Sequence, residues 1–142
     1  MPTTIKSMNT LLVEDNLMSK NILIVDDEED VRAIAQMGLE MGAGWSVVTA
    51  SSGKEALEIA ADQKPDVILL DMMMPDMDGR TTLQQLKANP ATQPIPVILV
   101  TAKAQNGHQE IFANMPVAAI FAKPFRPLKL AEQISEALGW ND

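Results

Sequence analysis

The chain contains no cysteine and only one histidine among its 142 residues. Without cysteine it has no disulfide framework and no thiol chemistry. The single histidine, His108, lies in the polar stretch NGHQE and is not a metal site by itself. The absence of cysteine permits a cytoplasmic location, and that is the location we expect.

Basic residues are scarce as well. The chain has 11 Lys and Arg against 19 Asp and Glu, a net charge of −8, and no basic stripe. An acidic chain repels a phosphate backbone, so we expect no direct binding of nucleic acid.

Long apolar runs are also missing. No stretch approaches the ~18 apolar residues of a membrane span, and residues 1–20 lack the apolar core of a secretory signal. We therefore expect no association with membranes. What is present is the composition of one globular domain, with 46% hydrophobic and 21% charged residues.

Five short apolar runs predict β-strands. They are Ile22–Val25, Val47–Ala50, Val67–Leu70, Val97–Val100 and Ala118–Phe121. The first, third and fourth are continuously apolar, as expected of strands that are covered on both faces. The second run is less apolar, which suggests a strand at the edge of the sheet.

Amphipathic helical patterns separate these runs. Their apolar faces are Val31, Ile34, Ala35 and Leu39; then Ala56, Leu57, Ala60 and Ala61; then Leu83 and Leu86; and finally Leu130, Ala131, Ile134 and Leu138. Ser52 and Glu55 fit a capping box at the start of the second helix. Pro127 is expected to begin the last helix and Gly139 to end it. A weaker helical pattern covers residues 105–114.

The alternation of strands and helices predicts the fold class. Each gap between strands holds one helix, which implies parallel strands and right-handed crossovers. We therefore expect an α/β fold, a doubly wound sheet in a three-layer sandwich.

Charged and polar residues follow four of the five strands. Asp26, Asp27 and Glu28 follow the first strand, Asp71 the third, Thr101 and Ala102 the fourth, and Lys123 and Pro124 the fifth. In an open parallel sheet, ligands bind beyond the carboxyl ends of the strands. The sequence thus predicts that the three carboxylates of Asp26, Asp27 and Asp71 lie at the carboxyl ends of the strands together with the hydroxyl of Thr101 and the ammonium group of Lys123.

These acids should not all exist there as bare anions. Two unit charges ~4 Å apart repel by about 4 kcal/mol at an effective dielectric constant of ~20. Either one acid keeps a proton or a cation neutralises the cluster, and hard oxygen ligands favour Mg²⁺. Lys123 suits a phosphoryl group, Thr101 can donate a hydrogen bond to one, and a carboxylate can act as a nucleophile to give an aspartyl-phosphate.

Each feature has a simpler interpretation when it is taken alone. The acids after the first strand could be solvated residues that favour a helix dipole, and Lys123 could be an ordinary surface lysine. The coincidence of Asp26, Asp27, Asp71 and Lys123 at one predicted edge favours a site.

Four segments together resemble the receiver domain of two-component response regulators. They are ILIVDDEEDVR (22–32), VILLDMMMPDMDG (67–79), PVILVTA (96–102) and FAKPF (121–125). The resemblance covers about residues 20–140. It implies a flavodoxin-like sandwich with a five-stranded parallel sheet in the order 2-1-3-4-5.

The resemblance also implies a role for each matched residue. Asp71 is expected to be the phosphoacceptor. Mg²⁺ is expected to be held by Asp26, Asp27, Asp71 and the backbone carbonyl of Met73. Thr101 is expected to bind a phosphoryl oxygen, Lys123 to pair with the phosphoryl group, and the bond from Lys123 to Pro124 to be cis. Gly79 is expected to open the third helix, and Ala102 to leave access to Asp71.

The acidic motif occurs twice, since Glu14-Asp15 also follows the apolar residues Leu11-Leu12-Val13. In the family the acidic pair precedes the phosphoacceptor by roughly 45 residues. Asp27 is 44 residues before Asp71 and Asp15 is 56 before it, so Asp26-Asp27 is the expected working pair. We expect residues 1–19 to be a poorly ordered extension, with packing of Leu11–Val13 on a neighbour as the alternative, and residues 20–142 to be the receiver domain.

Two departures from the family pattern stand out. Many receivers carry an aromatic residue three positions before the lysine, where this chain has Ile120, followed by Phe121. Met73 and Lys103 occupy positions that tune dephosphorylation, and Met73 cannot hydrogen-bond an attacking water. Slow self-dephosphorylation is therefore expected.

The favoured function is a stand-alone phosphorylation switch in a phosphorelay. A sensor histidine kinase or phosphotransfer protein donates the phosphoryl group, and the surface of the fourth helix, fifth strand and fifth helix (about 105–138) then changes for an unknown downstream protein. We expect a monomer or weak homodimer that is no enzyme beyond its own phosphorylation and dephosphorylation. The alternatives are a phosphorylation-independent interaction module and a Mg²⁺-dependent aspartyl phosphatase, which would usually need an acid in place of Met73.

Overall fold

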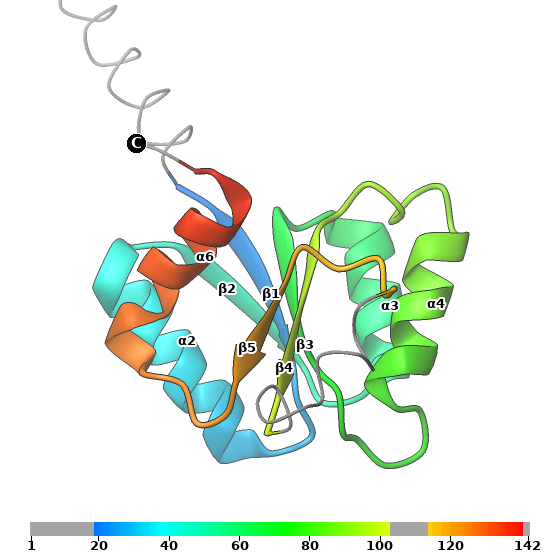
Figure 1. Cartoon of the computed structure of the whole chain (residues 1–142), viewed down its shortest axis with the longest axis horizontal. Helices are drawn as coiled ribbons and strands as arrows, with labels where there is room; N and C mark the ends of the chain where they lie inside the picture. The colour runs from blue at the N-terminus through cyan, green and yellow to red at the C-terminus, as the bar shows by residue number, and fades with distance from the viewer. Residues whose placement is uncertain (1–18, 103–113, 141–142) are drawn as a thin grey trace, which may run out of the picture.

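The computed structural model describes residues 19–102 and 114–140. Within these ranges a parallel sheet lies at the centre, with helices on both of its faces (Figure 1). The extension expected at residues 1–19, apart from Ser19 itself, and the weak helical pattern at 105–114, apart from Asn114, lie outside the described residues.

The five strands of the sheet are β1 (Asn21–Val25), β2 (Ser46–Ala50), β3 (Val67–Asp71), β4 (Val97–Thr101) and β5 (Ala119–Ala122). Each begins and ends within one residue of the predicted bounds. Their order is β2-β1-β3-β4-β5, and all four pairings are parallel. The predicted fold class and strand order are confirmed, and the less apolar strand β2 lies at an edge.

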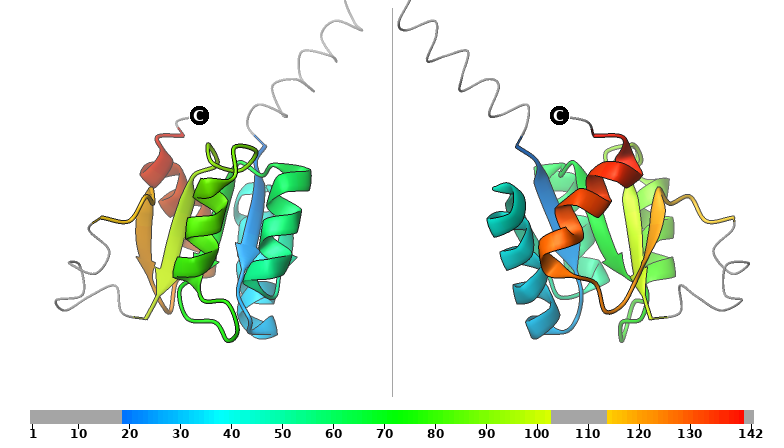
Figure 2. Two further views of the ribbon diagram at one scale, coloured as in Figure 1. Left: turned by 90° about the vertical axis from the view of Figure 1, so that its right-hand side faces the viewer. Right: turned by 60° about the vertical axis from the view of Figure 1, so that its left-hand side comes forward.

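The helices of the described ranges form the two outer layers. They are α2 (Glu29–Ala43), α3 (Gly53–Gln63), α4 (Gly79–Ala88) and α6 (Leu130–Leu138), with the 3-10 helix η1 (Pro127–Lys129) directly before α6. Helices α2 and α6 cover one face of the sheet, and α3 and α4 cover the other (Figure 2). None of the helices in these ranges is long and apolar enough to cross a membrane.

Each face of the sheet has its own apolar core. Leu23 and Val25 of β1 point toward α3 and α4, and Ile22 and Ile24 point toward α2 and α6. Successive side chains of a strand point to opposite faces, so a strand covered on both sides must be apolar throughout. This explains the unbroken apolar runs of β1, β3 and β4.

The start of α3 follows the predicted cap with one difference. The Ser52 hydroxyl accepts a hydrogen bond from the Glu55 backbone N–H at 3.2 Å. The Glu55 carboxylate accepts in turn from the backbone N–H of Ser51, at 2.7 Å, rather than from that of Ser52. The cap therefore pairs the N–H groups of Glu55 and Ser51.

Helix α2 differs from the prediction at Ile34, which is 48% exposed. The buried face of α2 is formed by Ala35, Gly38 and Leu39, and Ile34 lies about 100° around the helix from Ala35. Gly38 allows α2 to approach η1, because a Cβ atom there would collide with the Pro127 carbonyl oxygen. Pro127 starts η1 and not the α-helix, so α6 begins three residues later than predicted.

Aromatic side chains pack at the end of the sheet where β1 starts and α6 ends. Trp45 and Trp140 pack edge to face, with ring centroids 5.6 Å apart, and the Lys20 ammonium lies 4.5 Å from the Trp140 ring centroid. The strands end at the opposite end of the sheet, as Figure 1 shows.

Candidate functional site

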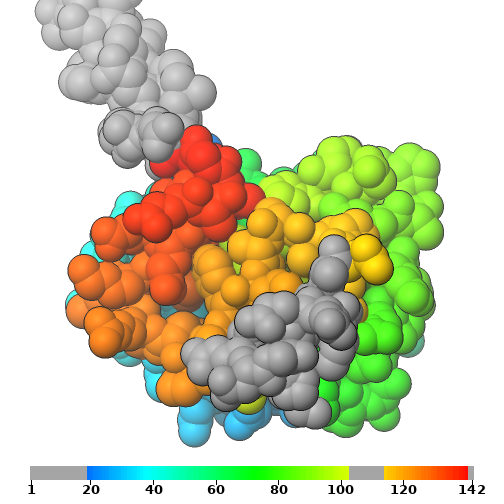
Figure 3. Space-filling model, in the orientation of Figure 1, coloured from blue at the N-terminus to red at the C-terminus, as the bar shows by residue number. Residues whose placement is uncertain are grey.

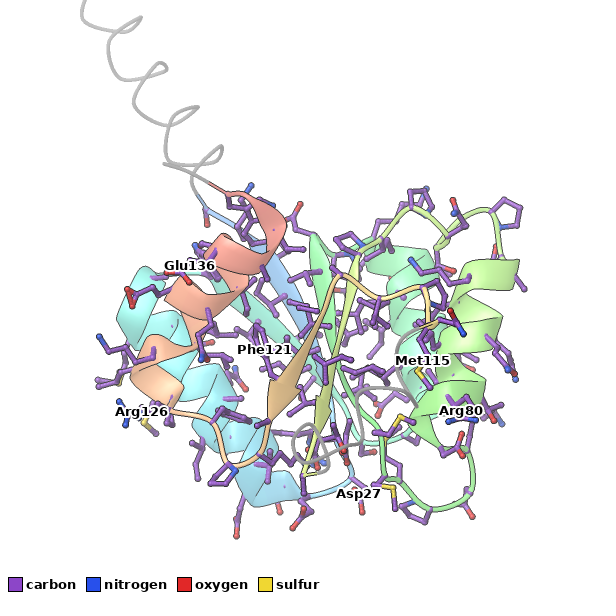
Figure 4. All side chains as sticks on the ribbon, in the orientation of Figure 1. Asp27, Arg80, Met115, Phe121, Arg126 and Glu136 are labelled. Atoms are coloured by element: carbon purple, nitrogen blue, oxygen red, sulfur yellow. The ribbon has the colours of Figure 1, made fainter. Side chains whose placement is uncertain are left out.

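Three carboxylates converge where β1 and β3 end. One carboxylate oxygen from each of Asp26, Asp27 and Asp71 lies within 4.8 Å of the other two. Figure 4 shows Asp27 at this edge, beyond the ends of the strands. The convergence predicted from the sheet topology is therefore found in the structure.

The strand register explains why two of these acids meet. Strands β1 and β3 are neighbours with Val25 opposite Leu70, so the next residues, Asp26 and Asp71, lie side by side. Successive side chains of a strand point to opposite faces, so Asp26 points to the same face as Ile24, and Asp71 to the same face as Leu69. This is the face covered by α2 and α6. Both aspartates are only 3% exposed, whereas Asp27 is exposed to solvent.

Lys123 follows β5, the edge strand farthest from β2, and contacts both buried acids. Its Nζ donates to Asp26 Oδ2 at 2.8 Å and lies 3.2 Å from Asp71 Oδ1. The backbone supports this placement, because Lys123 N–H donates to the Thr101 carbonyl at 3.0 Å. The peptide bond from Lys123 to Pro124 is cis, as expected.

Burial and repulsion perturb the pKa of Asp71. Burial raises the pKa of this carboxyl, the negative charge of Asp26 raises it further, and Lys123 and the Met73 N–H lower it, which leaves the pKa at about 6. Burial alone would lower the pKa of Lys123, but its hydrogen bond to Asp26 and the charges of Asp71 and Asp26 outweigh this, so its pKa is raised. One lysine therefore does not fully neutralise the acidic cluster.

This arrangement fits a hard divalent cation. The candidate metal ligands are all carboxylate oxygens, and one lysine contacts two of the three acids. After burial, the negative charge of Asp26 is the second cause that raises the pKa of Asp71, and a cation would relieve that repulsion. The Met73 N–H donates to Asp71 Oδ1 at 3.3 Å, so this segment borders the cluster. Its carbonyl as a fourth protein ligand stays a prediction.

The loop after β3 folds back tightly onto the strand end. Gly79, the first residue of α4, donates its N–H to the Met72 carbonyl at 3.0 Å. A Cβ atom on Gly79 would lie 2.5 Å from the Asp71 carbonyl oxygen and 2.7 Å from Met72 Cα. Glycine is required here because the backbones approach so closely. Gly79 opens the helix as expected, while Asp78 caps it by accepting from the Thr81 N–H at 2.9 Å.

Comparison with known proteins identifies the family. Residues 22–135 match the response regulator receiver domain. The chain belongs to this family. Receiver domains are the phosphorylation-activated switches of two-component signalling, and that general function is the function of this domain.

Relatives with known names carry the same domain in longer chains. The chain is 36% identical over 121 residues to the alkaline phosphatase synthesis transcriptional regulatory protein PhoP of Bacillus subtilis, covering 85% of this chain and 49% of that protein. It is 49% identical over 119 residues to the response regulator PleD of Caulobacter vibrioides, covering 82% of this chain and 26% of that protein. The chain thus spans about half or less of these relatives.

Solved structures agree with the fold. The chemotaxis protein CheY4 of Vibrio cholerae superposes with a TM-score of 0.76 at 26% identity, covering 84% of this chain and 98% of that chain. A sensor histidine kinase receiver domain from Pseudomonas aeruginosa PAO1, with a magnesium ion coordinated in its active-site cleft, gives a TM-score of 0.75 at 26% identity, covering 85% of this chain and 98% of that chain.

The remaining predicted residues of the receiver domain lie in β4 and β5 or directly after β4. Thr101 is buried at the end of β4, next to Val100, which pairs with Asp71. Ala102 is exposed. Ile120 belongs to the α3 and α4 side of the sheet, as Leu99 beside it does. By alternation Thr101 shares that side, so Ile120 occupies the side where the family's aromatic residue is expected.

Phe121 does not replace the missing aromatic residue. It packs with the core under α2 and α6, on the opposite side of the sheet from Ile120, and Figure 4 shows its ring between β5 and α6. Neighbouring residues of a strand point to opposite faces. Phe121 therefore cannot take the place of the aromatic residue that many receivers carry at the position of Ile120.

A shallow apolar groove of about 340 Å³ lies beside Lys123. It is lined by Val31, Ile34, Ala102, Lys123, Pro124 and Phe125. The exposed Ile34, which the sequence pattern assigned to the core-facing side, thus borders the site.

Sequence reasoning missed one contact at the receiver site. The Arg32 guanidinium donates to the backbone carbonyl of Asp26 at 2.7 Å. Arg32 follows Asp26 by six residues, in the second turn of α2. The sequence does indicate this contact in one way. Arg32 lies near the start of the helix after the acidic pair, close enough for its long side chain to reach the backbone of Asp26.

Proposed function

We propose that this receiver domain works as a phosphorelay switch in which Asp71 accepts a phosphoryl group from a sensor histidine kinase or phosphotransfer protein. The observation that carries the proposal is the contact of Lys123 with Asp71 and Asp26, inside a cluster of three carboxylates at the ends of the strands. A nucleophilic carboxylate, a metal-binding group and a fixed cation are the parts that phosphoryl transfer to an aspartate requires.

Asp71 has a suitable charge state for a nucleophile. With its pKa at about 6, the carboxyl is mostly ionised at neutral pH. A carboxylate oxygen attacks phosphorus and a new O–P bond forms as the bond from phosphorus to the donor nitrogen breaks. The donor imidazole keeps that electron pair and takes up a proton, and Asp71 becomes an acyl phosphate.

Lys123 stabilises the charge that arrives with the phosphoryl group. Its ammonium is 3.2 Å from Asp71 Oδ1, so it lies where negative charge accumulates and needs no rearrangement. Asp26, Asp27, Asp71 and the Met73 carbonyl are the proposed ligands of Mg²⁺, which supplies further positive charge to the phosphoryl oxygens when bound.

Thr101 and the end of β5 are proposed to transmit phosphorylation of Asp71 to the protein surface. A phosphoryl group on Asp71 recruits the Thr101 hydroxyl, at the last residue of β4, and Lys123, the residue directly after β5. In Figure 3, β5 and the residues of η1 and α6 lie together on the face toward the viewer. A shift of the strand ends would alter this surface for a protein partner.

The groove beside Lys123 is the proposed approach for a protein donor. Asp71 is only 3% exposed, and the groove opens beside its partner Lys123, so a phosphohistidine that enters there brings its protein into contact with the groove. Exposed apolar side chains at Ile34 and Met37, 48% and 56% exposed, favour docking of a protein surface over a small polar molecule alone.

The test is intact-mass measurement after incubation with Mg²⁺ and a small acyl phosphate. The proposal predicts one phosphoryl adduct per chain, stable through the measurement, and no adduct on Asp71→Asn. The matched control is Asp62→Asn, an exposed carboxylate on α3, which should be phosphorylated like the wild type.

The other outcomes separate the alternatives. Many turnovers of the phosphodonor without an adduct would support an aspartyl phosphatase. Neither adduct nor turnover would support a module that acts without phosphorylation. An adduct that persists in Asp71→Asn would place the phosphoacceptor elsewhere.

A further inference from the structure

We infer that Arg32 is a positioning residue for the acidic cluster, because it fixes the peptide unit between Asp26 and Asp27 and so aims the Asp27 carboxylate at the metal position. The inference deepens the proposed function and rests on it. Nothing in the sequence pattern of the acids requires this residue; the hydrogen bond from its guanidinium to the Asp26 carbonyl, 2.7 Å long, is the starting observation.

Asp26 is held by hydrogen bonds on every polar group that it has. Its N–H donates to the Ala50 carbonyl at 3.1 Å, its Oδ1 accepts from the Glu28 N–H at 2.8 Å, and its Oδ2 accepts from Lys123 Nζ at 2.8 Å. Arg32 supplies the fourth bond, to the carbonyl oxygen. The Asp26 side chain and N–H are therefore fixed without Arg32, whereas the carbonyl is fixed by it.

The Asp26 carbonyl belongs to the peptide unit that continues into Asp27. A peptide unit is planar, so holding its oxygen also fixes the nitrogen and Cα of Asp27. Asp27 is exposed to solvent, and burial does not restrain its direction. Arg32 is anchored in turn, because its own N–H donates to the Glu28 carbonyl at 3.1 Å within the start of α2.

The contact between Arg32 and the Asp26 carbonyl orients the backbone and does not neutralise a carboxylate. In residues 19–102 and 114–140, the ion pairs within 4.0 Å join Lys123 to Asp26 and Asp71 and Lys129 to Glu132, and Arg32 is in none of them. Its guanidinium is directed at a backbone carbonyl instead. Outer partners that orient metal ligands typically contribute 10- to 100-fold in metal affinity.

The experiment measures Mg²⁺ affinity by isothermal titration calorimetry, with no phosphodonor present. Arg32→Ala, which has no side-chain donor, and Arg32→Gln, whose amide is two bonds shorter than the guanidinium, should bind Mg²⁺ about 10-fold more weakly than the wild type. Arg32→Lys keeps a donor on a long stem and should recover to within about 3-fold. The control Arg126→Ala removes the same charge from an exposed arginine after β5, away from Asp27 in Figure 4, and should match the wild type.

A second readout separates positioning from a general structural role. At saturating Mg²⁺ the maximal phosphorylation rate of Arg32→Gln should stay within about 3-fold of the wild type, because the metal restores the ligand geometry. Circular dichroism checks folding, and Arg32→Gln, which keeps helix propensity, decides the test if Arg32→Ala unfolds.

Three results would overturn the inference: Mg²⁺ affinity of Arg32→Ala and Arg32→Gln within twofold of the wild type, an equal loss in Arg126→Ala, or no recovery in Arg32→Lys. Failure of the proposed function looks different. In that case the wild type would bind Mg²⁺ with the predicted dependence on Arg32 but would form no phosphoryl adduct.

Discussion

Replacing Asp71 with asparagine should stabilise the metal-free protein at neutral pH. The folded-state pKa of Asp71 is about 6, against an ordinary value of 3.8. Between these two values the folded protein keeps a proton that the unfolded chain has already lost. Stability therefore falls as pH rises through this window, and above about pH 6 the full cost of the buried charge is present.

The shift of about two pKa units corresponds to ~3 kcal/mol, at 1.36 kcal/mol per unit. Asparagine has nearly the same shape and carries no charge, so Asp71→Asn should exceed the wild type by up to that amount above pH 6 and match it below pH 4. In urea, with m about 2 kcal/mol/M, the midpoint should rise by roughly 1.5 M.

The assay is urea unfolding with a chelator present, at several values between pH 4 and pH 8. Asp62→Asn serves as the exposed control and should stay within about 0.5 kcal/mol of the wild type. Saturating Mg²⁺ should stabilise the wild type more than Asp71→Asn and narrow their difference. The reasoning is refuted if Asp71→Asn is no more stable than the wild type at pH 7.5, or if its advantage is the same at pH 4.

Three further predictions concern the surroundings of Asp71. Gly79→Ala should lose about 2–3 kcal/mol of stability and most phosphorylation, since its Cβ would press on the Asp71 carbonyl oxygen at 2.5 Å; urea unfolding and intact mass measure both, and a neutral variant contradicts it. Asp76→Gly should gain about 0.5–1 kcal/mol, because Asp76 has a φ of +66°, and a loss in urea unfolding would show that this backbone is not strained. Ile34→Glu should slow phosphorylation by a protein donor at least 10-fold but not by acyl phosphate; equal slowing of both, or of neither, contradicts docking at the groove.

Much of the site could be predicted because topology converts sequence order into position. Runs that are apolar on both faces must be central strands, and parallel strands end at one edge. It follows that Asp26, Asp71 and Lys123 should meet, although up to 97 residues separate them. The strand bounds agree to one residue, since a polar residue directly follows each of the first four apolar runs.

The errors have a common physical origin. Ile34 was assigned to the apolar face of α2, but the contact face of a helix is chosen by its neighbours, here the sheet and η1. Periodicity gives a stripe about 100° wide or more and does not say which side of it will be covered. Pro127 starts a 3-10 turn for a similar reason, since its place is set by packing against Gly38.

By itself the sequence determined the alternation of strands and helices, the parallel sheet, and the edge at which the acids and the lysine gather. These depend on short-range patterns and on chain connectivity, which are written along the chain. The tertiary structure alone decided that Lys123 bonds Asp26 at 2.8 Å, that the pKa of Asp71 rises to about 6, and that Arg32 holds the Asp26 carbonyl. Such properties depend on distance and burial, and these exist only once separate segments have packed together.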